Sequence, residues 1–116
     1  MSAAAKTLFD KIIAREIPGT FVYEDEHCVA IRDINACAPM HLLLIPRKSL
    51  GQLSHADASD QMLLGHLLLT ASKIAAQEGL GNAYRLVVNN GAAAGMSVPH
   101  LHLHIIGGRP LKWPPA

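Results

Sequence analysis

Apolar positions along this chain fall into short runs separated by polar turns, and most of these runs predict β-strands. The runs cover residues 21–24, 28–32, 40–45 and 84–89. The third run, Met-His-Leu-Leu-Leu-Ile, is apolar at nearly every position and stops at Pro46. It therefore predicts a buried central strand.

Two segments carry the period of amphipathic helices instead. Residues 7–13 predict a short helix that Thr7 caps, with Asp10 three residues later. Residues 57–78 predict the one long helix, which Gly79 ends. The apolar surface of this helix is wider than one sheet face needs, which suggests self-association. Together the elements predict an α+β fold, a meander-like antiparallel sheet with its helices on one face.

The most informative pattern lies near the C-terminus, where three histidines alternate with leucines over residues 100–104. Successive side chains of a strand point to opposite faces, so a strand here places the three imidazoles on one face and the leucines on the other. A loop of small residues, 90–97, precedes the motif. Backbone N–H groups of such a loop can bind phosphate oxygens, with the Ser97 hydroxyl and the Asn89 amide as further donors.

Three interpretations of this motif stay open on the residues alone. A purely structural role is unfavourable, because three buried polar rings would each need partners. A catalytic zinc site is the second interpretation, since His100, His102 and His104 could share an ion and His41 offers a further ligand. Nucleophilic catalysis fits the alternation best, because a neutral His102 imidazole can attack phosphorus if an acceptor holds its other ring nitrogen.

Composition and charge narrow the class of function. The 116 residues suit a single domain over 1–116. Residues 1–6 are expected to be flexible. Residues 110–116 form a tail whose prolines prevent regular structure. Hydrophobic residues make up 50% of the chain, as in a globular protein. The net charge is +1 without a basic block, so nucleic acid is not an expected partner.

The cysteines and the apolar runs bear on location. Cys28 and Cys37 form no CxxC pair, which favours a reducing compartment over a disulfide framework. The N-terminal residues lack the apolar core of a signal peptide, and the most apolar run, 62–71, is too short to cross a membrane. We therefore expect a soluble protein of the cytoplasm, or also of the nucleus in a eukaryote, without a membrane partner.

The chain resembles the histidine triad (HIT) superfamily, whose signature is His-φ-His-φ-His-φ-φ, where φ is an apolar residue. Residues 100–106 match this signature in full. The chain is most similar to the branch of histidine triad nucleotide-binding proteins, the purine nucleoside phosphoramidases, which close on a segment like Trp113-Pro114-Pro115. The resemblance extends over residues 9–13, 33–34, 38–46, 84–89 and 107–109.

This resemblance implies the HIT fold, a five-stranded antiparallel sheet with two helices, which joins that of a second copy into a ten-stranded sheet in a homodimer. It implies hydrolysis of adenosine or guanosine 5′-phosphoramidates to a nucleoside monophosphate and an amine through a nucleotidyl-histidine intermediate. The expected partner is a purine nucleotide, AMP or GMP or their phosphoramidates, and no cofactor or metal is expected. Two alternatives stay open: a dinucleoside polyphosphate hydrolase, and a nucleotide-binding regulatory or scaffold protein.

Residue roles also follow from the resemblance. His102 matches the nucleophile, His100 the residue whose carbonyl orients that imidazole, and His104 the contact to phosphate and leaving group. His41 matches a fourth histidine that continues the hydrogen-bond relay behind the triad, and Asp33 matches the ribose-binding carboxylate. The other matches are Phe9, Ile12, Ile17, Ile31, Ile34 and Leu43 for the base pocket, Asn89, Gly95, Met96 and the catalytic Ser97 for the phosphate, and Trp113 for a tail that reaches the partner subunit.

Two positions next to the motif depart from the superfamily pattern. Met96 stands where glutamine is usual, and a thioether cannot donate a hydrogen bond. The backbone N–H of Met96 can still donate, so we expect activity to survive with an altered leaving-group preference. Pro99 is the second departure, since members often carry an aromatic or polar residue there.

Overall fold

The computed structural model describes residues 6–116, so the flexibility expected of residues 1–6 concerns a segment that lies almost wholly outside the described residues. Helix α1 (Leu8–Ile13) begins where the sequence predicts. The Thr7 hydroxyl accepts the Asp10 N–H, and the Asp10 carboxylate accepts the Thr7 N–H. This capping box satisfies N–H groups that the first helical turn leaves without partners.

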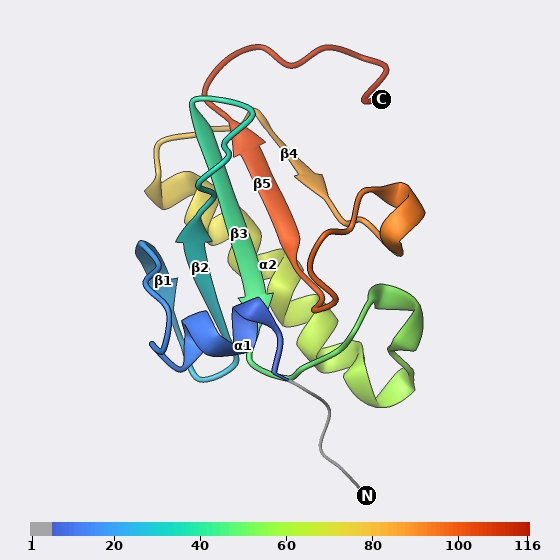
Figure 1. Cartoon of the computed structure of the whole chain (residues 1–116). Helices are drawn as coiled ribbons and strands as arrows, with labels where there is room; N and C mark the ends of the chain where they lie inside the picture. Colours follow the sequence, from blue (N-terminus) through green and yellow to red (C-terminus); the bar gives the residue numbers. More distant parts are fainter. Residues whose placement is uncertain (1–5) are drawn as a thin grey trace, which may run out of the picture.

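Five strands form one antiparallel sheet, as predicted: β1 (Phe21–Glu24), β2 (Cys28–Arg32), β3 (Met40–Pro46), β4 (Tyr84–Val87) and β5 (Leu103–Gly107). Their order is β1-β2-β3-β5-β4. The predicted meander is therefore wrong beyond β3, because the chain first makes the edge strand β4 and then returns as β5 beside β3 (Figure 1). This return places the end of the histidine motif against the strand that carries His41.

The long helix, α2 (Gln61–Gln77), crosses one face of the sheet and is shorter than predicted. Two 3₁₀ turns, Leu53–His55 and Ala58–Asp60, precede it, and a third, Ala92–Ala94, follows β4. The Asp57 carboxylate accepts the Ser59 N–H and caps the turn Ala58–Asp60. Asp57 therefore begins this turn and not, as the sequence predicts, the long helix.

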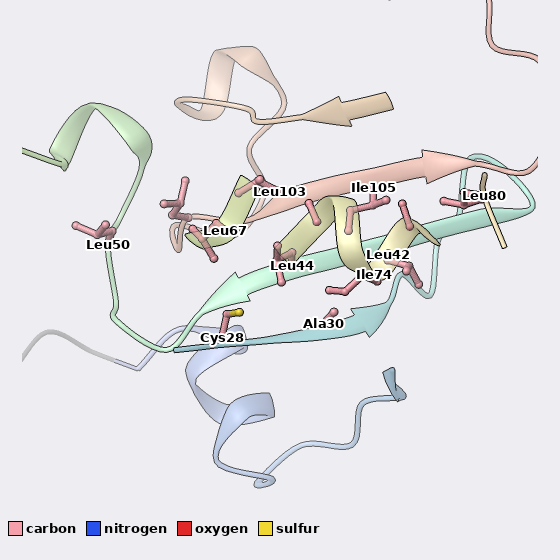
Figure 2. Close-up of a cluster of buried hydrophobic side chains, with 13 residues drawn as sticks. Cys28, Ala30, Leu42, Leu44, Leu50, Leu67, Ile74, Leu80, Leu103 and Ile105 are labelled. Carbon is pink, nitrogen blue, oxygen red and sulfur yellow. The ribbon is translucent and has the colours of Figure 1, made fainter. Parts of the chain in front are cut away.

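The prediction that both helices cover one face is wrong, because α1 and α2 pack on opposite faces of the sheet (Figure 1). Strands β2 and β3 are apolar at consecutive positions, so both of their faces need cover. Ala30, Leu42 and Leu44 lie with α2 (Figure 2), whereas Ile31 and Leu43 lie with α1. Since α1 has only six residues, the face it covers stays partly open.

The histidine motif is only half a strand. β5 begins at Leu103, so the predicted strand is wrong for the residues before it. β3 ends at Pro46, whose carbonyl accepts the N–H of the His100 ring, and the Leu101 N–H donates instead to the Leu50 carbonyl at 2.6 Å. The alternation of faces persists all the same, because Leu101 and Leu103 pack in the core under α2 and the imidazoles lie on the side of α1.

The remaining differences concern the ends of elements. β4 stops at Val87, whereas the sequence predicts a strand to residue 89. Residues 108–116 contain neither helix nor strand, as their prolines predict. None of the helices within residues 6–116 combines the length and the apolarity needed to cross a lipid bilayer.

Candidate functional site

A cavity of about 490 Å³ lies on the α1 face of the sheet. Its walls come from α1, the segment that leads into β1, the end of β2, the middle of β3 and the chain around the histidine motif. It brings together most of the site residues that the sequence predicts: Phe9, Ile12, Ile17, Ile31, Asp33, Ile34, Leu43, Ser97, His102 and His104.

The loop before the motif contributes less than expected. Asn89, Gly95 and Met96 do not line the cavity. The Met96 N–H donates to the Gly91 carbonyl at 3.3 Å, and the Gly95 N–H donates to the Ala92 carbonyl at 3.0 Å. The expectation that the Met96 N–H serves a phosphate is therefore corrected, because the loop uses this donor to hold its own turn.

Trp113 also lies outside the cavity walls, in the tail that follows β5. Its side chain is 80% exposed. Within one copy of the chain it therefore takes no part in the site.

His102 is buried against the ring of Phe9, with the two ring centroids 4.8 Å apart. Its Nδ1 lies 2.7 Å from the backbone carbonyl oxygen of His100. A carbonyl can only accept, so the proton of the neutral imidazole sits on Nδ1 and Nε2 keeps its lone pair. Burial lowers the pKa of His102 below its ordinary value, which keeps this lone pair free at neutral pH.

His100 is fully buried, and both of its ring nitrogens have partners. Nε2 donates to the Pro46 carbonyl at 2.8 Å, and Nδ1 lies 3.0 Å from the Thr7 hydroxyl and 3.5 Å from the Asp10 carboxylate. These contacts fix the backbone carbonyl that orients His102. Sequence reasoning missed this use of Thr7 and Pro46, because they lie 93 and 54 positions from His100 and no local pattern links them.

His41 lies beside His104, the last histidine of the motif. The Cys37 N–H donates to His41 Nδ1 at 3.1 Å, so the proton of neutral His41 sits on Nε2. This Nε2–H donates to His104 Nδ1 at 2.8 Å. The proton of neutral His104 is then on Nε2. The Cys37 N–H thus sets the tautomer of His41, and His41 sets the tautomer of His104.

His104 Nε2 is buried and has no hydrogen-bond partner among residues 6–116. Burial, with the neighbouring His102 and His41, lowers the pKa of His104 to about 4, so the ring is neutral at pH 7. A buried N–H without a partner is unfavourable by about 1–3 kcal/mol. Because His104 lines the cavity, a ligand bound there can supply the missing acceptor.

Asp33 lies at the same end of the cavity. One carboxylate oxygen is 3.3 Å from His41 Nε2, and the other accepts the Asn35 N–H at 2.8 Å. Asp33, His41 and His104 bring donor atoms within 4.8 Å of one another, so these residues of the site could hold a metal ion. His100 and His102 do not belong to this set of donor atoms.

The arrangement joins a nucleophile to hydrogen-bond donors in an apolar cavity. His102 offers a free Nε2, His104 offers an N–H, and Ser97 lines the wall with a hydroxyl. Such a set can form a covalent bond to an electrophilic phosphorus while the donors stabilise the developing negative charge.

Comparisons with known proteins agree with this geometry. The model of the HIT domain matches residues 14–111. An uncharacterized HIT-like protein of Synechocystis sp. is 59% identical over 97% of this chain and 98% of its own length, and the 14 kDa zinc-binding protein of Zea mays is 50% identical over 94% and 87%. The crystal structure of a HIT family hydrolase from Legionella pneumophila has a TM-score of 0.93 at 45% identity, covering 96% of this chain and 100% of that one.

Proposed function

This chain belongs to the HIT domain family, and on that premise we propose that it is a purine nucleoside phosphoramidase. It hydrolyses adenosine or guanosine 5′-phosphoramidates to a nucleoside monophosphate and an amine. The observation that carries the proposal is the hydrogen bond from His102 Nδ1 to the His100 carbonyl, which leaves a neutral, nucleophilic Nε2 at the cavity wall.

The nucleotide occupies the cavity with its base among apolar side chains and its ribose near Asp33. The base contacts are Phe9, Ile12, Ile17, Ile31, Ile34 and Leu43. Ile34 is 95% exposed at the rim, and a base stacked on it would remove this apolar surface from water. The Asp33 carboxylate accepts hydrogen bonds from the ribose hydroxyls, because each of its two oxygens can accept one from a neighbouring hydroxyl. Asn89 and Gly95 do not line the cavity of the ligand-free chain, and their contact with the phosphate stays a prediction.

Catalysis divides between two imidazoles and a hydroxyl. His102 Nε2 attacks the α-phosphorus, the phosphorus–nitrogen bond breaks, and the nitrogen takes a proton from water and leaves as the amine; the later attack of water on phosphorus returns this proton to solvent. The negative charge that develops is stabilised by the Ser97 hydroxyl and by His104 Nε2–H, whose donor state is set through His41. Water then attacks the nucleotidyl-imidazole, which releases the nucleoside monophosphate and restores the lone pair of His102.

The proposal is tested by substrate choice. Purified protein should hydrolyse an AMP–lysine phosphoramidate far faster than a diadenosine polyphosphate, with AMP as the nucleotide product. Faster cleavage of the polyphosphate would replace the proposal by the dinucleoside polyphosphate hydrolase. Binding of AMP without turnover of either substrate would favour the regulatory or scaffold protein.

A metal-dependent hydrolase is the second candidate. It is supported by the similarity to the 14 kDa zinc-binding protein of Zea mays and by the donor atoms of Asp33, His41 and His104 at the cavity. Exhaustive chelation separates the two candidates. Phosphoramidase activity should be unchanged after chelation, and a loss that added zinc restores would establish the metal-dependent reaction instead.

The pH dependence follows from the lowered pKa of His102. Attack requires the neutral ring, so protonation of His102 removes activity as the pH falls through its pKa. Because burial holds this pKa below the ordinary 6.5, the midpoint of the acidic decline in kcat/KM should lie below pH 6.5. A profile that has already fallen to half at pH 6.5 or above would contradict the assignment.

We also propose that two copies form a homodimer. β4 is an edge strand whose outer N–H and C=O groups have no strand beside them, and α2 exposes Met62 (86%), Leu68 (55%) and Leu69 (76%). Pairing of two β4 edges would give a ten-stranded sheet and cover these side chains, with Trp113 reaching the partner.

Sedimentation should give twice the chain mass for the native protein and a shift to the chain mass for Leu69→Glu; a monomeric native protein would refute the dimer.

A further inference from the structure

A second cluster of metal-ligating side chains lies on the α2 face of the sheet, away from the cavity. It joins Asp25 in the turn after β1, Cys28 at the start of β2 and His66 on α2, with one donor atom of each within 4.8 Å of the others. Cys28 packs in the core between the sheet and α2 (Figure 2), on the opposite face from His102. The reaction proposed above uses none of these residues.

The Asp25 carboxylate is the centre of the cluster. One oxygen is 2.8 Å from His66 Nε2, and the other is 3.4 Å from Cys28 Sγ. The second oxygen also accepts the N–H groups of His27 and Cys28, at 2.7 and 2.8 Å. Backbone donors thus hold the carboxylate in place, as outer contacts do for a metal ligand.

We propose that Asp25, Cys28 and His66 bind a zinc ion. A thiolate, an imidazole and a carboxylate are the ligands that zinc prefers, whereas magnesium and calcium take oxygen ligands. In a tetrahedral zinc site such donor atoms are about 3.3–3.6 Å apart, from zinc–ligand distances of about 2.0–2.3 Å. One ligand atom of each residue lies within 4.8 Å of the others, and the two Asp25 oxygens contact His66 at 2.8 Å and Cys28 at 3.4 Å, so small side-chain adjustments bring the donors to that spacing.

The protons of the metal-free cluster account for its present hydrogen bonds. The Cys28 thiol donates to the Asp25 carboxylate at 3.4 Å, so the sulfur carries a proton until a cation replaces it. Zinc displaces the thiol proton to solvent, and the His66 ring then binds zinc through Nε2 and carries its proton on Nδ1. His27 is the nearest further donor, with its ring centroid 5.1 Å from that of His66.

The consequence is mechanical and independent of the proposed catalysis. The ion would connect the turn between β1 and β2 to helix α2. Its ligands Asp25 and His66 are 41 positions apart in the sequence. A ligand that binds only the folded chain stabilises it in proportion to the logarithm of ligand concentration. Zinc should therefore raise the melting temperature of the protein.

Cobalt(II) titration of the full chain tests the site, because a tetrahedral cobalt–thiolate bond produces a near-ultraviolet charge-transfer band. The native protein and the matched control Cys37→Ser should both develop this band with one equivalent of cobalt, and zinc should bleach it. Cys28→Ser should lose the band, and His66→Ala should weaken binding at least tenfold. A native protein without the band, or a band that survives Cys28→Ser or disappears in Cys37→Ser, would overturn the proposal.

Zinc-dependent melting provides the second measurement, since Cys28 is fully buried and its replacement can impair folding. His66 is partly exposed on α2, so His66→Ala should fold and hydrolyse phosphoramidates as the native chain does. The melting temperature should rise with zinc in the native protein and in Cys37→Ser, and stay constant in His66→Ala. An equal rise in His66→Ala would place the ion elsewhere, such as at Asp33, His41 and His104, and would refute this site.

Discussion

Replacement of His102 by alanine should lower kcat for an adenosine phosphoramidate by about 10⁴-fold or more, the size of effect seen when a covalent nucleophile is removed. The reason is the geometry of the ring: the His100 carbonyl holds Nδ1–H, and Nε2 is the atom that forms the bond to phosphorus. Steady-state kinetics of the purified variant measures the loss. Circular dichroism should show the native fold, because the backbone contacts around His102 do not depend on its side chain.

His102→Asn separates chemistry from binding. This side chain removes the attacking nitrogen while the cavity walls stay in place, so AMP should still bind, as titration calorimetry would show. His55, exposed in a 3₁₀ turn away from the cavity, supplies the matched control, and His55→Ala should keep native kinetics. Substantial turnover by His102→Ala would refute the assignment of the nucleophile.

Removal of His104 should have the second largest effect. His104→Ala deletes the buried Nε2–H that has no partner in the described chain, and it should lower kcat by about 10²–10³-fold, as loss of one donor to a developing charge does. KM should change little, because the interaction strengthens mainly as charge develops on the phosphoryl group. Steady-state kinetics with phosphoramidates of different amines measures both parameters.

A donor-retaining variant makes this second prediction specific. His104→Gln keeps an N–H near the position of Nε2, so it should recover part of the rate that His104→Ala loses. If both variants were equally slow, or if the loss were in KM alone, His104 would be a binding residue and the charge-stabilising role would fail.

The sequence predicts the sheet and the site residues better than it predicts their connections. Alternation places Leu101 and Leu103 in the core and the imidazoles on the other side, and this holds even where β5 has not begun. Consecutive apolar residues in β2 and β3 show that both faces are buried, but not which helix covers which face. That choice depends on the path of the chain between elements, which periodicity does not encode.

The resemblance implies the contact of His102 with the His100 carbonyl, but the partners of the His100 ring are beyond sequence reasoning. Thr7 is predicted as a helix cap, and only the fold shows that its hydroxyl also meets His100. The position of Met96 next to the motif suggests a phosphate contact, yet its N–H closes the turn before Ser97. For Thr7 a local pattern identifies the residue, and long-range packing decides its further partner.

The central claim is a covalent nucleotidyl intermediate on His102, and mass spectrometry tests it most directly. Excess protein should be mixed with an adenosine phosphoramidate, quenched rapidly in alkaline denaturant and digested. The account predicts an adenylyl group on the peptide that contains the histidine motif, located at His102 by fragmentation and absent from His102→Asn. Complete hydrolysis of the substrate in the same mixture with no adenylyl group at any early time, or with the group on another residue, would contradict it.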